Sequence, residues 1–193
     1  MGADSAERFV TGDMNRFAML LFLLSEAAFF AFLIIAYLYS YQAVRVGPDA
    51  ADSLDPMKAG IYTVFLLASS FSVWRAENCY RRGRKGAFLS WLLGTILLGT
   101  IFLVGQAREY THLYRANVTV SRNIFGTAFF TLTGFHGLHV LLGLIALTIL
   151  FALAAADPMS RQSSAVRTIA TYWHFVDWLW VIIFSVVYLR GVI

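Results

Sequence analysis

The chain has 193 residues, of which 59% are hydrophobic and only 13% are charged, and its mean hydropathy is +0.68. The charged share is about half that of soluble domains, so a soluble fold of this size could not bury so much apolar surface. The net charge of +4 comes from basic residues that lie mostly at the ends of apolar segments. Membrane topology therefore explains this charge better than nucleic-acid binding does. The single cysteine, Cys79, excludes an intramolecular disulfide and a cysteine metal cluster.

Apolar segments separated by short polar connections follow one another along the chain. A hydrocarbon core about 30 Å thick needs about 20 mainly apolar residues in a helix. The segments that meet this requirement are residues 16–42, 57–80, 86–108, 124–155 and 165–190. None alternates like a membrane β-barrel strand, so satisfaction of the backbone hydrogen bonds in lipid favours helices. The sequence predicts an all-α, polytopic membrane protein with five transmembrane helices, residues 1–193 forming a single transmembrane domain.

The basic residues between these segments predict the orientation in the membrane. The second connection holds four of them within five positions: Arg81, Arg82, Arg84 and Lys85. Such a cluster marks the cytoplasmic side. Arg161 in the fourth connection agrees, whereas Arg115 and Arg122 in the third argue weakly the other way. We therefore expect the N-terminus to be cytoplasmic and the C-terminus to be outside.

Ionisable residues also lie inside the predicted spans, where a charge costs roughly 2.5–3.5 kcal/mol. These residues are Glu26, His136, His139, His174 and Asp177. With a rise of about 1.5 Å per residue, they lie at similar depths in three helices. The spacing of i, i+3 within each of the last two helices places two of the side chains on one face. The sequence predicts an intramembrane polar layer in which a carboxyl group pairs with a histidine or a backbone group.

Three interpretations of this layer are open. The side chains can hold helices together or line a lipid cavity, they can exchange protons, or they can bind a metal or haem. The metal interpretation is the weakest, because copper or zinc needs three or four convergent ligands. A relay lacks further acids within the spans, since Glu77, Glu109 and Asp157 fall at or beyond the expected helix ends. We expect a structural or lipid-cavity role, and neither a catalytic residue nor a metal ligand.

Two stretches carry a resemblance to a known family: TGFHGLHVLLGLIAL at 133–147 and YWHFVDWLWVIIFSVVYL at 172–189. With SEAAFFAFL at 25–33 and GQAREYTHL at 105–113, in the same order, they resemble the helices of subunit III of haem–copper terminal oxidases. The resemblance covers about residues 16–190 and is to the five-helix bacterial form. Seven-helix members have two further helices before the one that carries the glutamate. We therefore expect another subunit to complete the lipid cleft to which those helices contribute.

The resemblance implies a non-catalytic subunit of a proton-pumping respiratory oxidase that reduces oxygen to water. Such a subunit stabilises the catalytic subunit and holds structural phospholipid, while haem and copper belong to the partner subunits I and II. The expected partners are these two subunits and membrane lipids, with no nucleic acid. The expected location is the bacterial plasma membrane, which the chain crosses several times. By position, the five residues of the polar layer match the polar intramembrane residues of the family.

Other functions fit parts of the same pattern. A quinol oxidase or a nitric oxide reductase would use a similar five-helix subunit, and this chain says almost nothing about the electron donor. An independent membrane transporter would instead require a continuous polar path through the chain. A haem-carrying membrane anchor would show haem absorption in the isolated chain.

Overall fold

Long helices make up the part of the chain that the computed structural model describes, which is residues 3–43, 56–115, 124–156 and 163–189. These helices are α1 (Ala3–Ala43), α2 (Pro56–Arg81), α3 (Lys85–Arg115), α4 (Ile124–Ala156) and α5 (Ser163–Phe184), the last continuing into a π-helical turn, η3 (Ser185–Leu189). Each of the five contains a segment long and apolar enough to cross a membrane. The predicted all-α membrane fold with five spans is therefore confirmed.

The helices extend beyond several of the predicted spans. α1 begins at Ala3 and α3 continues to Arg115, because a helix can run past the hydrocarbon boundary into polar sequence, where apolarity no longer marks its end. The orientation in the membrane stays a prediction. Arg122 and Arg161, on which it partly depends, lie outside the described residues.

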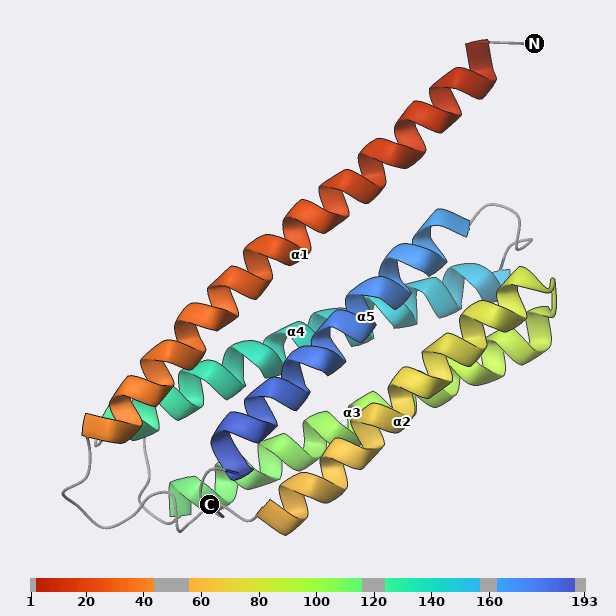
Figure 1. Ribbon diagram of the computed structural model, residues 1–193. Coiled ribbons are helices and arrows are strands. Elements are labelled where there is room, and N and C mark those ends of the chain that lie inside the picture. The colour runs from red at the N-terminus through yellow and green to blue at the C-terminus, as the bar shows by residue number, and fades with distance from the viewer. Residues whose placement is uncertain (1–2, 44–55, 116–123, 157–162, 190–193) are drawn as a thin grey trace.

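Four of the helices form a bundle, and the fifth lies on its outside. α2 packs against α3, α3 against α4, α4 against α5 and α5 against α2, which closes the ring, whereas α1 contacts α4 and α5. Figure 1 shows α1 approaching α4 near its C-terminal end and diverging from the bundle towards its N-terminus. Only 6% of the most apolar part of its Phe17–Ser40 span is buried, compared with 28–39% in the other four spans. Most of the surface of α1 is therefore available to lipid or to another protein.

Glycines allow a large side chain to enter the centre of the bundle. A Cβ added to Gly99 of α3 would lie 2.8 Å from the ring of Trp173, and one added to Gly143 of α4 would also lie 2.8 Å from it. Trp173 itself is fully buried. The side chain of α5 thus occupies the space that two missing side chains leave on neighbouring helices, which is how small residues bring membrane helices together.

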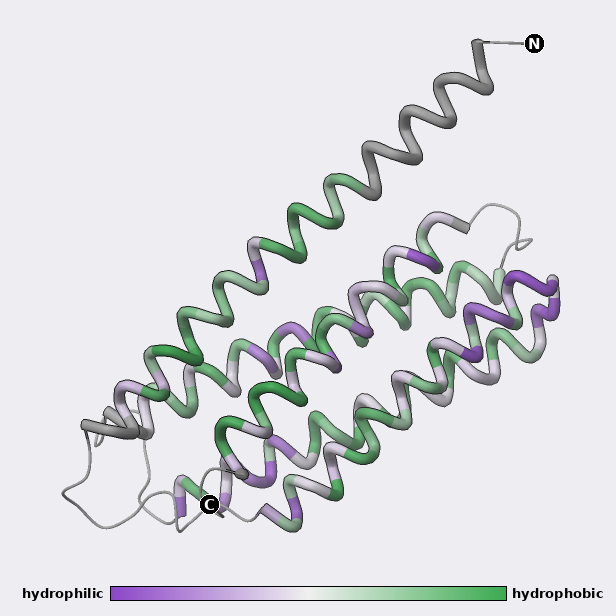
Figure 2. Tube along the Cα trace, in the orientation of Figure 1, coloured by the Kyte–Doolittle hydropathy of each residue, from purple (hydrophilic) through white to green (hydrophobic). Residues whose placement is uncertain are grey.

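A tight turn joins α2 to α3. Gly83 has a φ of 68°, a left-handed conformation that glycine adopts without steric cost. Its N–H donates to the carbonyl of Tyr80 at 3.0 Å, and the N–H of Arg84 donates to the carbonyl of Cys79 at 3.0 Å. These bonds satisfy carbonyls that the end of α2 leaves free. Figure 2 shows that hydrophilic residues concentrate at this turn, while apolar residues dominate the middle of the helices.

We predict that Gly99→Ala lowers the free energy of unfolding by about 1–3 kcal/mol, because the new methyl group must displace the Trp173 ring. Unfolding of the purified chain in mild detergent measures this. Gly86→Ala is the matched control: nothing lies within 4 Å of a Cβ at Gly86, so the better helix former should leave stability unchanged or raise it by about 0.5–1 kcal/mol. Equal effects of the two changes would contradict this packing.

Candidate functional site

Glu26 of α1 meets His139 of α4 inside the membrane-spanning part of the chain. The Glu26 Oε2 and His139 Nε2 atoms lie 2.9 Å apart, and the two side chains are 21% and 11% exposed. On the other side of the imidazole, Nδ1 lies 2.7 Å from the carbonyl oxygen of Phe135. The ring of Phe30 packs edge-on against the imidazole. This partly shielded pair is a polar connection between the outer helix and the bundle.

The geometry of the hydrogen bonds determines how protons are distributed in the pair. A carbonyl oxygen can only accept, so Nδ1 of His139 carries a proton and donates it to Phe135. A hydrogen bond between Nε2 and the Glu26 carboxyl group, which lie 2.9 Å apart, requires one further proton. On nitrogen this proton gives an ion pair, and on oxygen it gives two neutral groups. The net charge is zero in both cases, which avoids the large cost of an unpaired charge in lipid.

A tyrosine of α5 approaches the same pair from another direction. The Tyr172 hydroxyl donates to the backbone carbonyl of His139 at 3.2 Å. The ring of Phe22, one turn before Glu26 on α1, lies 6.3 Å from the Tyr172 ring, centroid to centroid. α1, α4 and α5 therefore meet at the depth of the Glu26–His139 pair.

Hydroxyl groups of α2 accept hydrogen bonds from two tryptophans of α5. Trp173 Nε1 donates to Ser69 Oγ at 3.0 Å, and Trp180 Nε1 donates to Thr63 Oγ1 at 2.9 Å. The hydroxyls in turn donate to carbonyls of their own helix. Since the higher residue number on α5 pairs with the lower one on α2, the two helices run antiparallel, with indole N–H groups satisfied at both levels.

His174 and Asp177 lie on the same side of α5, towards α2. The His174 Nδ1 atom is 2.6 Å from Ser70 Oγ, and the same hydroxyl lies near the Asp177 carboxyl group. Asp177 is only 2% exposed, yet neither of its oxygens has a hydrogen-bond partner of ordinary geometry among the described residues. A buried polar group left in this state costs about 1–3 kcal/mol. Asp177 therefore contributes less to holding α2 and α5 together than His174 does.

His136 packs as an aromatic ring. It is fully buried, stacks on Trp180 with ring centroids 4.8 Å apart, and meets the edge of Phe102 at 6.0 Å. Among the residues that the structure describes, neither ring nitrogen has a hydrogen-bond partner. His136 thus fills space between α3, α4 and α5.

The five residues of the predicted polar layer consequently occupy three separate places: the contact of α1 with α4, the contact of α2 with α5, and the interior between α3, α4 and α5. Only Glu26 and His139 pair with each other. The described residues contain no group of three or more histidine, cysteine, aspartate or glutamate side chains that could hold a metal ion. The structural or lipid-cavity role of the five residues stays a prediction.

Sequence reasoning missed a polar cluster between α3 and α4. Gln106 Nε2 donates to the carbonyl of Thr133 at 2.7 Å, and the hydroxyls of Tyr110 and Thr133 share a hydrogen bond of 2.7 Å. Gly137 leaves room for this arrangement, since a Cβ there would lie 3.1 Å from Gln106 Oε1. The i, i+4 spacing of Gln106 and Tyr110 places both on one face of α3, and this was the signal that could have revealed the cluster.

Comparisons with known proteins find similarity to subunit III of terminal oxidases over nearly the whole chain. The model of the family described as cytochrome c oxidase subunit III matches residues 5–192. A relative from Corynebacterium diphtheriae, named cytochrome c oxidase subunit 3, is 38% identical over 91% of this chain and 88% of its own length. A relative of the same name from Synechocystis sp. is 36% identical over 92% of this chain and 76% of its own length. A third, from Pseudomonas aeruginosa, is named cytochrome bo(3) ubiquinol oxidase subunit 3 and is 31% identical over 99% of this chain and 92% of its own length.

We predict that Glu26→Ala and His139→Ala are energetically coupled, since either change removes the same hydrogen bond. The double-mutant cycle should give a coupling free energy of about 0.5–2 kcal/mol, the range found for polar contacts between membrane helices. Unfolding of the purified chain and its variants in mild detergent measures it. A control cycle that combines Glu26→Ala with His174→Ala should be additive, because these side chains lie at different helix contacts. Additivity in the first cycle would show that the pair does not form.

Proposed function

Because the chain belongs to the cytochrome c oxidase subunit III family, we propose that it is a non-catalytic subunit of a proton-pumping respiratory oxidase. The observation that carries this proposal is the match over residues 5–192, which includes all five membrane-spanning helices. As a subunit III, the chain partners other oxidase subunits. In the proposal these are the catalytic subunit I and subunit II, which hold the haem and copper.

The arrangement of the helices supports a role in assembly. The four-helix bundle is held by close packing and by hydrogen bonds between helices, whereas α1 presents most of its apolar surface outwards. An apolar surface of this length needs a lipid or protein neighbour. We propose that subunit I and structural phospholipid cover it, and that the chain stabilises subunit I through this contact. The membrane is proposed to be the bacterial plasma membrane, in keeping with the bacterial sources of the relatives.

The electron donor of the complex has two candidates. The names of two relatives refer to cytochrome c oxidase, and the name of the third refers to a ubiquinol oxidase. The relatives named for cytochrome c oxidase are more similar, at 36% and 38% identity compared with 31%. We therefore propose a cytochrome c oxidase as the first candidate and a quinol oxidase as the second.

We predict that the tagged chain, purified in mild detergent from its native membrane, brings down a large polytopic subunit that contains haem and copper. The optical spectrum of the preparation and its metal content measure this. Oxygen consumption with reduced cytochrome c and with a quinol then distinguishes the two donors. Recovery of the chain as a haem-free homo-oligomer would contradict the proposal.

We also predict that His174→Ala and Ser70→Ala weaken retention of the subunit in the complex to a similar extent, because each removes the same contact between α2 and α5. Asp177→Asn should weaken it less, because neither carboxyl oxygen has a hydrogen-bond partner of ordinary geometry among the described residues. The ratio of this chain to subunit I after purification measures retention, and initial oxygen consumption should fall only modestly. Ser90→Ala is the control, since this exposed serine bonds only to its own helix. An immediate and complete loss of turnover in a fully assembled complex would oppose a structural role.

A further inference from the structure

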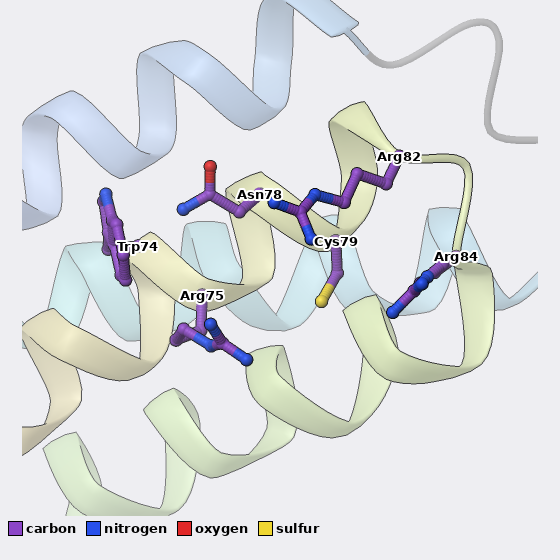
Figure 3. A pocket seen from close by; sticks show the side chains of 6 residues that line it. All are labelled: Trp74, Arg75, Asn78, Cys79, Arg82 and Arg84. Atoms are coloured by element: carbon purple, nitrogen blue, oxygen red, sulfur yellow. The ribbon is translucent and has the colours of Figure 1, made fainter.

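The turn between α2 and α3 borders a basic pocket on the outer side of the bundle. The pocket has a volume of about 170 Å³ and is lined by Trp74, Arg75, Asn78, Cys79, Arg82 and Arg84. Figure 3 shows the Cys79 thiol between the side chains of Arg75 and Arg84, with Arg82 reaching back from the turn. Three guanidinium groups thus surround one small space at the end of a membrane-spanning helix.

Arg75, Arg82 and Arg84 have no acidic side chain beside them to neutralise their charge among the described residues. The closest acidic residue along the helix, Glu77, pairs with Arg81 at 2.6 Å, and both of these side chains line a different pocket that faces Arg167 of α5. No ion pair joins Arg75, Arg82 or Arg84 to a carboxylate among the described residues. Like charges gathered in this way repel one another, so the pocket favours an anion that can accept several guanidinium hydrogen bonds, as a phosphate group does.

The position of Arg75 is held by an aromatic ring. Its guanidinium carbon lies 5.5 Å from the centroid of the Trp91 ring of α3. Phe71 contacts the rings of both Trp74 and Trp91. A guanidinium group held over an indole is already partly desolvated and oriented, which lowers the entropy lost when it binds an anion.

An exposed apolar stripe runs from this pocket along α2. Its members recur every three or four residues and are 45–76% exposed: Met57, Ile61, Val64, Leu67, Phe71 and Trp74. Val64 and Trp74 are ten positions apart, which is about 15 Å at a rise of about 1.5 Å per residue. This is about half of a hydrocarbon core roughly 30 Å thick, so the stripe can accompany an acyl chain through one leaflet.

We propose that the pocket of Arg75, Arg82 and Arg84, together with this stripe, binds an anionic phospholipid. The phosphate group lies among the guanidinium groups, Asn78 contributes a polar side chain, and the exposed indole of Trp74 lies at the membrane interface, where tryptophan is enriched. The acyl chains follow the stripe on α2. The site lies at α2 and α3, away from α1. All its residues belong to this chain, so it is a function in addition to the proposed role as an oxidase subunit.

Cys79 provides a reporter of occupancy, since it lines the pocket and is the only cysteine of the chain. In the full chain purified in mild detergent, phosphatidylglycerol should slow maleimide alkylation of Cys79, whereas phosphatidylcholine and inorganic phosphate at the same concentrations should not. Native mass spectrometry of retained phosphatidylglycerol gives a second, independent readout. Equal protection by phosphatidylcholine, or by inorganic phosphate, would overturn the proposal, the latter in favour of a free anion.

The variant R75Q/R82Q/R84Q should need about a hundredfold more phosphatidylglycerol for half-protection, since each arginine near a lipid surface contributes about 1 kcal/mol. The control R108Q/R115Q/R167Q removes the same charge elsewhere and should stay within about twofold of the unmodified chain. R82Q alone changes a residue on the exposed turn and should weaken binding about fivefold. This single variant is the test if the triple variant does not fold. Unchanged protection in R82Q and in the triple variant would overturn the proposal.

A second experiment repeats the alkylation of Cys79 in the complex that co-purifies with the chain. Phosphatidylglycerol should slow alkylation of Cys79 there as well. If Cys79 is instead shielded after complete delipidation, an acidic segment of a partner subunit covers the pocket, and the lipid proposal is wrong. Association with a haem-containing subunit is measured separately, so failure of the lipid site and failure of the proposed subunit role give different results.

Discussion

The packing of Trp173 is the contact on which the arrangement of the bundle depends. In lipid no hydrophobic force drives helices together, so close packing and hydrogen bonds between helices must hold them. Trp173 supplies both: its ring fills the space above Gly99 and Gly143, and its N–H group donates to Ser69. One side chain of α5 therefore connects α2, α3 and α4. The position of α5 against α2, which brings His174 to Ser70, follows from this contact.

α1 is attached to the bundle in a different way. It lacks comparable burial along its length, and its contacts with α4 and α5 centre on the Glu26–His139 pair and on aromatic rings that include Phe22 and Phe29. The hydrogen bond between Glu26 and His139 gives each of two ionisable groups in lipid a polar partner, and it joins the helices without leaving either group unpaired. The bundle can thus keep its internal geometry while the outer helix meets lipid or another subunit.

Composition and apolar segments were enough to predict the number and type of the helices, since lipid leaves few ways to satisfy a backbone. The cost of polar groups in lipid also identified Glu26 and His139 as residues that need a partner. It could not tell which helix each residue faces, because helix rotation depends on packing that the sequence does not display. His136 illustrates this: its spacing places it with His139, but the ring stacks on Trp180. The hydroxyls of Thr63, Ser69 and Ser70 were not recognised, because single serines and threonines are common in helices and become informative only when their acceptors or donors are known.

The polar groups inside the spans are separated from one another by packed side chains. No hydrogen bond between described residues joins the Glu26–His139 pair to Ser70 or His136, and the fully buried Trp173 ring occupies the centre of the bundle. Within the pair, Glu26 is the more exposed residue, at 21% compared with 11%, and it lies on the outer helix. Of the two side chains, that of Glu26 is therefore the one that a group outside the chain can approach more readily.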